Sequence, residues 1–296
     1  MNITLLDGGM GQELLRRSHR KVTPLWSADI MLHEPNLVRD LHCEFIQSGA
    51  RVITLNNYTA TPYRLARDGA LHEIHHIHKS AIQAAQNAIH MAGQSNVKIA
   101  GCLPPLVASY RSEVILPYED SLKNYRHLVD LQAADCDLFL CETMSSIDEA
   151  RAACVAAKES QKDVWVSFTV DDDTPSQLRS GEPLSEAATQ IEAIGANAIL
   201  LNCSHPEIIT QSMAFLKDIK TPIGAYANAF QCIHGLKPGG TVSNLKARDD
   251  LSPQQYAPYA MKWHDMGATI IGGCCEIGPE HIKYLHQEFK KMKRII

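Results

Sequence analysis

The amino-acid sequence predicts an α/β fold, a single parallel (β/α)8 TIM barrel that spans residues 1–296. Three observations support this prediction. Short apolar runs alternate with longer amphipathic segments, and the chain holds eight of each kind. The length suits one large α/β barrel. No linker, low-complexity tract or change of composition divides the chain.

The predicted strands are short, and several are apolar at nearly every position, as in AILL and ATIIGG. Such runs are typical of parallel strands that are covered on both faces. In chain order they are Ile3–Leu6, Val52–Leu55, Val97–Gly101, Leu138–Cys141, Val164–Val170, Ala198–Asn202, Pro222–Tyr226 and Ala268–Gly272.

The segments between the strands repeat apolar residues at the spacing of an amphipathic helix. They are Pro35–Ser48, Arg64–Met91, Glu119–Ala134, Ile147–Lys158, Leu184–Ile194, Pro206–Ile219 and Pro253–Met266. A last helix, Pro279–Lys293, begins near a proline and ends with basic residues, which suits the helix dipole.

Charge and hydropathy exclude several classes of partner. Lys and Arg number 28 against 33 Asp and Glu, a net charge of −5, so no basic excess exists to neutralise nucleic-acid phosphates. No apolar stretch approaches the roughly 18 residues of a membrane span. The opening residues lack the basic and apolar regions of a signal peptide. We therefore expect a cytoplasmic protein with small-molecule partners.

Polar or reactive residues recur at the ends of the predicted strands. They are Asp7, Asn56, Asn57, Glu142, Thr169, Asn202, Cys203, Asn228, Cys274 and Cys275. In a barrel the carboxyl ends of all strands open onto one face, and that face carries the active site. We expect the site there, and the long polar loop His234–Asp250 is a candidate cover for it.

Three of the nine cysteines stand apart from the rest. An odd number without an export signal indicates reduced thiols, most of which fill the core. Cys203 follows the sixth strand, whereas Cys274 and Cys275 follow the eighth after two glycines. Since alternate strands point side chains into one layer, the three thiols can converge at the barrel mouth.

Three thiolates are a complete protein contribution to a catalytic tetrahedral Zn²⁺ with one open position. From spacing alone, other interpretations stay open. The adjacent pair could be buried packing or a vicinal disulfide, and the zinc site could be structural, although no fourth ligand stands out.

The charge of such a site indicates its chemistry. Zn²⁺ with three thiolates carries −1, so it is a weak Lewis acid. A thiol that binds as fourth ligand loses its proton, and the complex then carries −2. That sulfur suits attack on a cationic methyl donor. Trp26, Tyr58 and Tyr226 are candidates for lining the donor pocket, because aromatic faces attract cations.

At these residues the sequence resembles the homocysteine S-methyltransferase family. The resemblance runs nearly end to end, through LLDGGMGQEL, NNYTATP, CETMSSIDEA, SGEPL, NCSHPE, AYANA and GATIIGGCCEIGPEHI. It implies a zinc-dependent (β/α)8 enzyme that makes methionine from homocysteine. The donor it implies is a small sulfonium, S-methylmethionine or S-adenosylmethionine.

The resemblance also implies roles for single residues. Cys203, Cys274 and Cys275 match the zinc ligands, and they are the catalytic residues we assign. Asp7 and Glu142 match the carboxylates that hold the amino group of homocysteine. Asn228 matches the asparagine of a Tyr-Pro-Asn motif that orders the substrate site. The chain after Cys275 is short, so we expect a monomer or a weak homodimer.

Several positions depart from the family pattern. They are the segment Cys102–Ala108 in place of Gly-Pro-x-Gly, Leu200 in place of glycine, Ala227 in place of proline, and Glu276-Ile277 after the cysteine pair. These departures bear on the acceptor rather than on the three cysteines.

Two other functions follow from the same residues. Cys203 and His205 lie two positions apart, which suggests a cysteine-nucleophile hydrolase or acyltransferase. Alternatively, the zinc–thiolate site belongs to a non-catalytic protein that binds thiols. Activity without metal indicates the first alternative, and thiol binding without methyl transfer indicates the second.

Overall fold

A computed structural model of the chain describes residues 2–233, 236, 240 and 245–295. Eight parallel strands form one sheet in the order β1-β8-β7-β6-β5-β4-β3-β2. Their bounds are β1 Thr4–Leu5, β2 Val52–Thr54, β3 Lys98–Leu103, β4 Leu138–Met144, β5 Asp163–Phe168, β6 Ala198–Asn202, β7 Ile223–Tyr226 and β8 Ala268–Ile271.

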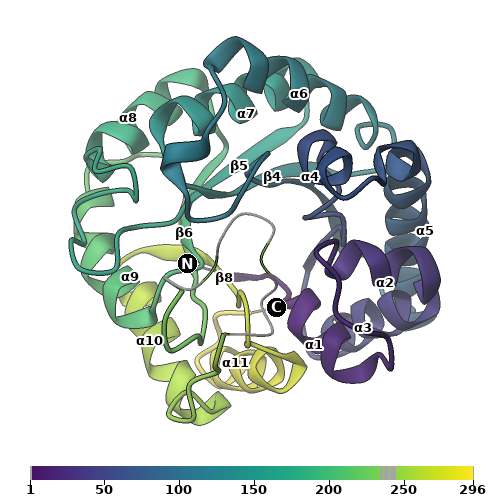
Figure 1. Cartoon of the computed structure of the whole chain (residues 1–296). Helices are drawn as coiled ribbons and strands as arrows, with labels where there is room; N and C mark the ends of the chain where they lie inside the picture. Colours follow the sequence, from purple (N-terminus) through teal and green to yellow (C-terminus); the bar gives the residue numbers. More distant parts are fainter. Residues whose placement is uncertain (1, 234–235, 237–239, 241–244, 296) are drawn as a thin grey trace.

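The sheet closes on itself between β1 and β2. Leu6 bridges Val52 in parallel register. The Arg51 N–H donates to the Leu5 carbonyl at 2.8 Å, and the Asp7 N–H donates to the Val52 carbonyl at 3.1 Å. Figure 1 shows the resulting ring of strands inside a ring of helices. This confirms the predicted (β/α)8 barrel.

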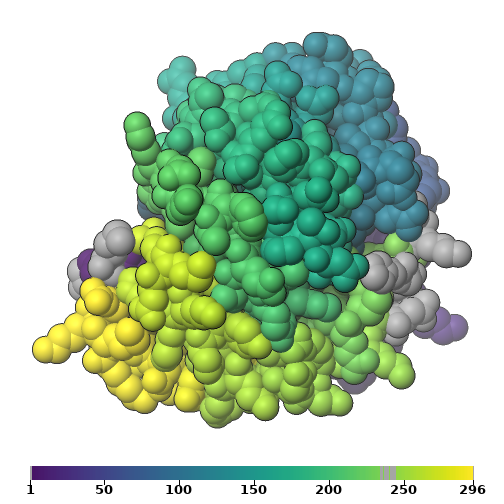
Figure 2. All heavy atoms as spheres, turned by 90° about the vertical axis from the view of Figure 1, so that its left-hand side faces the viewer, coloured from purple at the N-terminus to yellow at the C-terminus, as the bar shows by residue number. Residues whose placement is uncertain are grey.

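The helices are α1 Met10–Arg17, α2 Ser27–His33, α3 Pro35–Gln47, α4 Pro62–Arg67, α5 Ile74–Ala92, α6 Tyr118–Asp130, α7 Ile147–Glu159, α8 Leu184–Ile194, α9 Pro206–Ser212, α10 Pro253–Asp265 and α11 Pro279–Lys291. Short 3-10 turns lie at Leu71–Glu73, Ser112–Val114 and Met213–Leu216. Figure 2 views the molecule from the side of α8 to α10, whose segments lie next to one another on this face. None of the described helices is long and apolar enough to cross a bilayer.

Every predicted strand is present, with ends that shift by at most three residues. The single helix predicted over Arg64–Met91 is wrong. The chain breaks between α4 and α5, where Gly69 adopts a left-handed conformation with φ of +72°. The helix predicted over Pro206–Ile219 becomes a 3-10 turn after Ser212. Helices α1 and α2 were not predicted, because each is too short to establish an apolar period.

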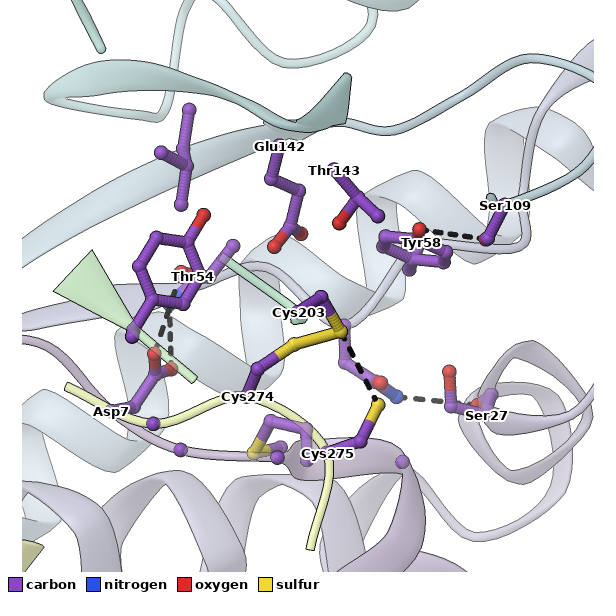
Figure 3. A pocket seen from close by; sticks show the side chains of 18 of the residues that line it. Asp7, Ser27, Thr54, Tyr58, Ser109, Glu142, Thr143, Cys203, Cys274 and Cys275 are labelled. Atoms are coloured by element: carbon purple, nitrogen blue, oxygen red, sulfur yellow. Dashed lines mark hydrogen bonds between the residues drawn. A yellow bond between two sulfur atoms is a disulfide. The ribbon is translucent and has the colours of Figure 1, made fainter. Parts of the chain in front are cut away.

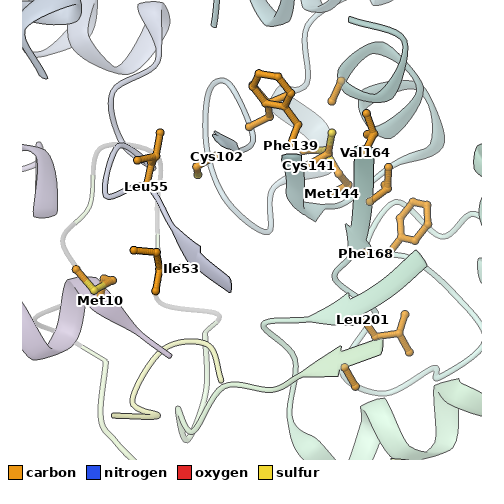
Figure 4. Packing of buried hydrophobic residues seen from close by; sticks show 14 of the residues in the cluster. Met10, Ile53, Leu55, Cys102, Phe139, Cys141, Met144, Val164, Phe168 and Leu201 are labelled. Atoms are coloured by element: carbon orange, nitrogen blue, oxygen red, sulfur yellow. The ribbon is translucent and has the colours of Figure 1, made fainter. Parts of the chain in front are cut away.

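Side chains of most strands alternate between two apolar clusters. Along β6, Ala198 and Leu200 belong to the small cluster inside the barrel, whereas Ile199 and Leu201 belong to the large cluster under the helices. Figure 4 shows part of the large cluster on β4, β5 and β6. Leu200 stands where the family pattern has glycine, and it packs against Gly224. A Cβ added at Gly224 would lie 3.0 Å from Cδ2 of Leu200.

Candidate active site

Cys203 follows β6, and Cys274 and Cys275 follow β8, so the closed barrel brings them to one mouth. Their three Sγ atoms all lie within 4.8 Å of one another. Figure 3 shows these sulfurs in one pocket, with Cys203 Sγ 3.9 Å from Cys275 Sγ. The structure thus gathers the cysteines that the sequence analysis singled out as metal ligands.

Cys203 and Cys274 form a disulfide. The expectation that these thiols are reduced is therefore wrong for this structure. The alternative of a vicinal disulfide between Cys274 and Cys275 is also wrong, because Cys274 is bonded to Cys203. The reason is geometric, since the ends of β6 and β8 place these two sulfurs closest together. The disulfide consumes two of the three thiols. A metal therefore requires the reduced form of this site.

The segment after β7 holds both cysteine loops in place. Four backbone hydrogen bonds of 2.9 to 3.2 Å join residues 226–229 to the two cysteine loops. Two of them involve the loop after β6, where the Cys203 N–H donates to Tyr226 and the Asn228 N–H donates to Ser204. The other two involve the loop after β8, where the Cys274 N–H donates to Ala227 and the Ala229 N–H donates to Cys275. This short segment sets the positions of the three sulfurs relative to one another.

Ala227, which stands where the family pattern has proline, takes part in a chain of two hydrogen bonds through the Tyr256 hydroxyl. We call this chain the relay. The Ala227 N–H donates to the Tyr256 hydroxyl at 3.1 Å, and that hydroxyl donates to the Gly272 carbonyl at 2.8 Å. Tyr256 is fully buried. A proline at position 227 would lack this N–H. The relay ties the ends of β7 and β8 together directly before Cys274.

Backbone strain concentrates at the same mouth. Among the described residues other than glycine, seven have positive φ. Four of them line the pocket (Trp26, Tyr110, Thr143 and Cys203), Glu276 follows Cys275, and Gln161 and Lys293 lie outside the pocket. Such conformations cost about 1–3 kcal/mol each and cluster at functional sites. Two hydrogen bonds to Asn202 hold Thr143. The Thr143 N–H donates to Asn202 Oδ1 at 3.0 Å, and Asn202 Nδ2 donates to the Thr143 hydroxyl at 2.9 Å.

Two carboxyls, the buried Asp7 after β1 and the partly buried Glu142 on β4, point into this pocket. The Asp7 Oδ2 accepts from the Thr54 N–H at 2.8 Å, and Glu142 accepts from the Cys102 thiol at 3.0 Å. Burial raises the pKa of Asp7 to about 8, opposed by the Thr54 bond and reinforced by the charge of Glu142. Burial also raises the pKa of Glu142 to about 7. A bound cation would stabilise both ionised forms.

The rest of the pocket wall is largely aromatic. Its described aromatic residues are Trp26, Tyr58, Tyr110, Tyr226 and Phe230, and no described lysine or arginine lines it. Trp26 and Tyr58 stack edge to face at 6.2 Å. Aromatic faces and carboxylates both attract cations. The wall therefore suits ligands that carry positive charge.

The N-terminus of α1 forms one side of the pocket through residues 8–11. Gly9 lies so close to the cysteine loop that an added Cβ would meet the Cys274 carbonyl oxygen at 2.5 Å. The first N–H groups of a helix have no partner inside the helix and attract anions. This end of α1 can hold a carboxylate beside the sulfurs.

The departure Glu276-Ile277 links the cysteine loop to α1. Glu276 accepts from Gln12 at 2.6 Å and from Arg16 at 2.5 Å, while the Ile277 carbonyl accepts from the Gly9 N–H at 2.9 Å. Burial, with Glu276 and Glu142 nearby, raises the pKa of the Cys275 thiol to about 12. A thiolate there requires a positive charge close by.

Some predicted residues lie elsewhere. Asn228 is buried but does not line the pocket; its Oδ1 accepts from the Phe230 N–H at 3.3 Å, and its Nδ2 has no partner among the described residues. Asn57 bonds His78 at 2.9 Å, away from the pocket. Most of the turn in His234–Asp250 lies outside the described residues, so its role as a cover stays a prediction.

The nucleophile pair Cys203 and His205 is not supported. His205 is the N-cap of α9, and its Nε2 has no partner among the described residues. The contacts of Cys203 Sγ are instead Cys274, Cys275 and the Tyr110 hydroxyl.

Sequence reasoning missed several pocket residues, namely Ser27, Thr54, Ser109, Tyr110 and Phe230. The available signal was position, since Thr54 ends a strand and Ser109 and Tyr110 follow the divergent segment Cys102–Ala108. Position alone does not show which side chains of a loop turn inward.

Comparisons with known proteins identify the family of this chain. The sequence profile of the homocysteine S-methyltransferase family matches residues 4–289. Homocysteine S-methyltransferase 1 of Arabidopsis thaliana is 27% identical, over 97% of this chain and 93% of the relative. Homocysteine S-methyltransferase of Escherichia coli (strain K12) is 29% identical, over 96% and 94%.

Two solved structures of the homocysteine methyltransferase MmuM from Escherichia coli have the same fold. The metallated form gives a TM-score of 0.82 and the oxidized form 0.81, each at 25% identity over 97% of this chain and 96% of that chain. The chain belongs to the homocysteine S-methyltransferase family and is a methyltransferase.

Proposed function

We propose that this protein transfers a methyl group from a sulfonium donor, S-methylmethionine or S-adenosylmethionine, to homocysteine and so forms methionine. In this proposal Cys203, Cys274 and Cys275 hold a Zn²⁺ ion. The observation that carries the proposal is the convergence of these three sulfurs within 4.8 Å at the wall of a pocket for cations.

One sulfur separation already fits zinc, whereas the Cys203–Cys274 disulfide must first be reduced. Tetrahedral Zn–S bonds of about 2.3 Å place neighbouring sulfurs about 3.8 Å apart. The Sγ atoms of Cys203 and Cys275 are 3.9 Å apart. When bound by three thiolates, Zn²⁺ supplies a position at which the acceptor thiol loses its proton and becomes a nucleophile at neutral pH.

The pocket provides groups for both ends of an amino-acid acceptor. Asp7 and Glu142 can accept charge-assisted hydrogen bonds from its ammonium group. The N-terminus of α1 can hold its carboxylate. An acceptor held at both groups extends its side chain toward the cysteine sulfurs, which lie in the same pocket (Figure 3). Homocysteine is such an acceptor.

The aromatic wall suits the methyl donor. Trp26, Tyr58 and Tyr226, the residues predicted for the donor, all line the pocket. The acceptor sulfur attacks the methyl carbon, a new C–S bond forms, and the sulfonium C–S bond breaks with its electron pair left on a neutral thioether. The protein aligns the two substrates for this in-line transfer.

Zinc content and methyl transfer test the proposal together. Protein purified under reducing, oxygen-free conditions is expected to hold about one zinc per chain. Cys203→Ala, Cys274→Ala and Cys275→Ala each lose the zinc and at least about 100-fold in transfer from either donor. Cys154→Ala is the matched control, because Cys154 is a buried free cysteine on α7 outside the pocket.

The possible results separate the functions. Full turnover in a ligand variant, or a wild-type protein that stays free of zinc after reconstitution, contradicts the proposed mechanism. Zinc and homocysteine binding without transfer from either donor would leave the non-catalytic thiol-binding alternative.

A further inference from the structure

The Tyr110 hydroxyl lies 2.9 Å from Cys203 Sγ. Tyr110 comes from the loop between β3 and α6, which follows the segment that departs from the family pattern. We propose that Tyr110 donates a hydrogen bond to the Cys203 thiolate in the metal-loaded protein and lowers the negative charge on that ligand. Tyr110 is then a positioning residue of the metal site, and the inference rests on the proposed zinc site.

The surrounding contacts fix the direction of the phenol ring. Tyr110 adopts a left-handed backbone conformation with φ of +64°. The guanidinium of Arg179 lies over the ring, 5.1 Å from its centroid. Arg179 is itself fixed by two bonds of 3.0 Å to Asp172 and one of 2.9 Å to the Thr169 hydroxyl. Its side chain is only 8% exposed.

This arrangement also strengthens the donor. A cation over an aromatic face draws electron density from the ring. The Tyr110 O–H is therefore a better hydrogen-bond donor than a phenol without such a neighbour. Because Asp172 neutralises Arg179, the pair adds no net charge to the pocket.

Three backbone donors near the sulfurs already have carbonyl partners. The Cys203 N–H donates to the Tyr226 carbonyl at 3.2 Å. The Gly273 N–H donates to the Asp7 carbonyl at 3.0 Å, and the Cys274 N–H donates to the Ala227 carbonyl at 2.9 Å. Within residues 2–233, 236, 240 and 245–295, Tyr110 is the only side chain with an O–H or N–H that bonds one of the three sulfurs.

The charge of the site gives this bond its effect. Zn²⁺ with three thiolates carries −1, and an acceptor thiolate brings it to −2. The carboxyls of Asp7 and Glu142 share the pocket, and no described lysine or arginine lines it. Hydrogen bonds to metal ligands offset such charge, and their loss typically lowers metal affinity 10- to 100-fold.

Cobalt spectroscopy tests the inference without reference to turnover. The full chain is reduced and loaded with Co²⁺ alone, and the sulfur-to-cobalt charge-transfer band is recorded. In Tyr110→Phe the Cys203 sulfur regains electron density, so the band shifts to lower energy and zinc affinity, measured by chelator competition, falls about 10-fold. Replacing Tyr110 by 3,5-difluorotyrosine strengthens the donor, so the band shifts to higher energy.

Tyr58→Phe is the matched control, because its hydroxyl lies in the same pocket but bonds Ser109 at 2.8 Å rather than a sulfur. It leaves the charge-transfer band unchanged. A band in Tyr110→Phe at the wild-type energy overturns the inference. A changed ligand-field pattern, which would make the hydroxyl a metal ligand, overturns it as well. Failure of the wild-type protein to bind either metal overturns the proposed zinc site and this inference together, so the two failures are distinguishable.

Discussion

Asp7 and Glu142 determine, at the scale of single residues, how binding of an amino-acid acceptor depends on pH. Burial raises the pKa of Asp7 to about 8 and that of Glu142 to about 7. Both carboxyls therefore take up protons as the pH falls through these values, and an ammonium group binds only their ionised forms. We expect affinity for methionine, whose sulfur does not titrate, to fall at least about tenfold between about pH 8 and pH 6.5.

Asp7→Asn removes one charge-assisted bond. Affinity for methionine should fall about 10- to 100-fold at pH 8, and its dependence on pH above 7 should flatten. Isothermal titration of the zinc-loaded protein measures both effects. Glu149→Gln is the control, since burial also raises the pKa of Glu149 to about 7 but this residue lies on α7 outside the pocket. Equal affinity of the wild-type protein at pH 6.5 and 8 would contradict the assigned role.

At the scale of elements, the apolar pattern was sufficient for the strands and insufficient for the short helices near the mouth. The run AILL is apolar on both faces, and the structure buries every residue of β6. Helix α1 has eight residues, of which two are arginines and one is glutamate, so its apolar side is too brief to recognise. The break at Gly69 depends on a left-handed φ, which an apolar pattern does not report.

The ends of β7 and β8 are held together by Tyr256 of α10, and this leads to a prediction for the element. In Tyr256→Phe, the buried Ala227 N–H and Gly272 carbonyl lose their partner. Leaving such groups unsatisfied costs about 1–3 kcal/mol of stability. Because the relay precedes Cys274 directly, zinc affinity should also fall, by about tenfold.

Chemical denaturation and chelator competition measure the two effects of Tyr256→Phe. Tyr259→Phe, on the same helix, removes a hydroxyl that bonds Glu207 at 2.8 Å and touches neither strand end. It should keep wild-type zinc affinity. An unchanged zinc affinity in Tyr256→Phe would show that the relay stabilises the fold without positioning the metal ligands.

At the scale of the whole molecule, barrel topology made the main part of the site predictable. Cys203 and Cys274 are separated by 71 positions, yet both follow strands that end at one mouth. Two features of the site could not be predicted, because each depends on side-chain positions that differ by only a few ångströms. Cys203, which bonds Cys274, and Tyr110, which lines the pocket, both adopt positive φ, a conformation that residue types do not specify.

The same topology makes the metal a link between distant parts of the chain, which gives the last prediction. Zinc at about 1,000 times its dissociation constant should stabilise the reduced protein by about 4 kcal/mol. For a chain of this size that corresponds to a rise in Tm of about 5–10 °C over protein treated with chelator. The oxidised protein should show no such rise, because its disulfide removes two of the three ligands. Calorimetry of both forms, with and without zinc, measures the difference, and reductant should restore the response. An equal zinc-induced rise in the oxidised form would place the stabilising metal elsewhere than at Cys203, Cys274 and Cys275.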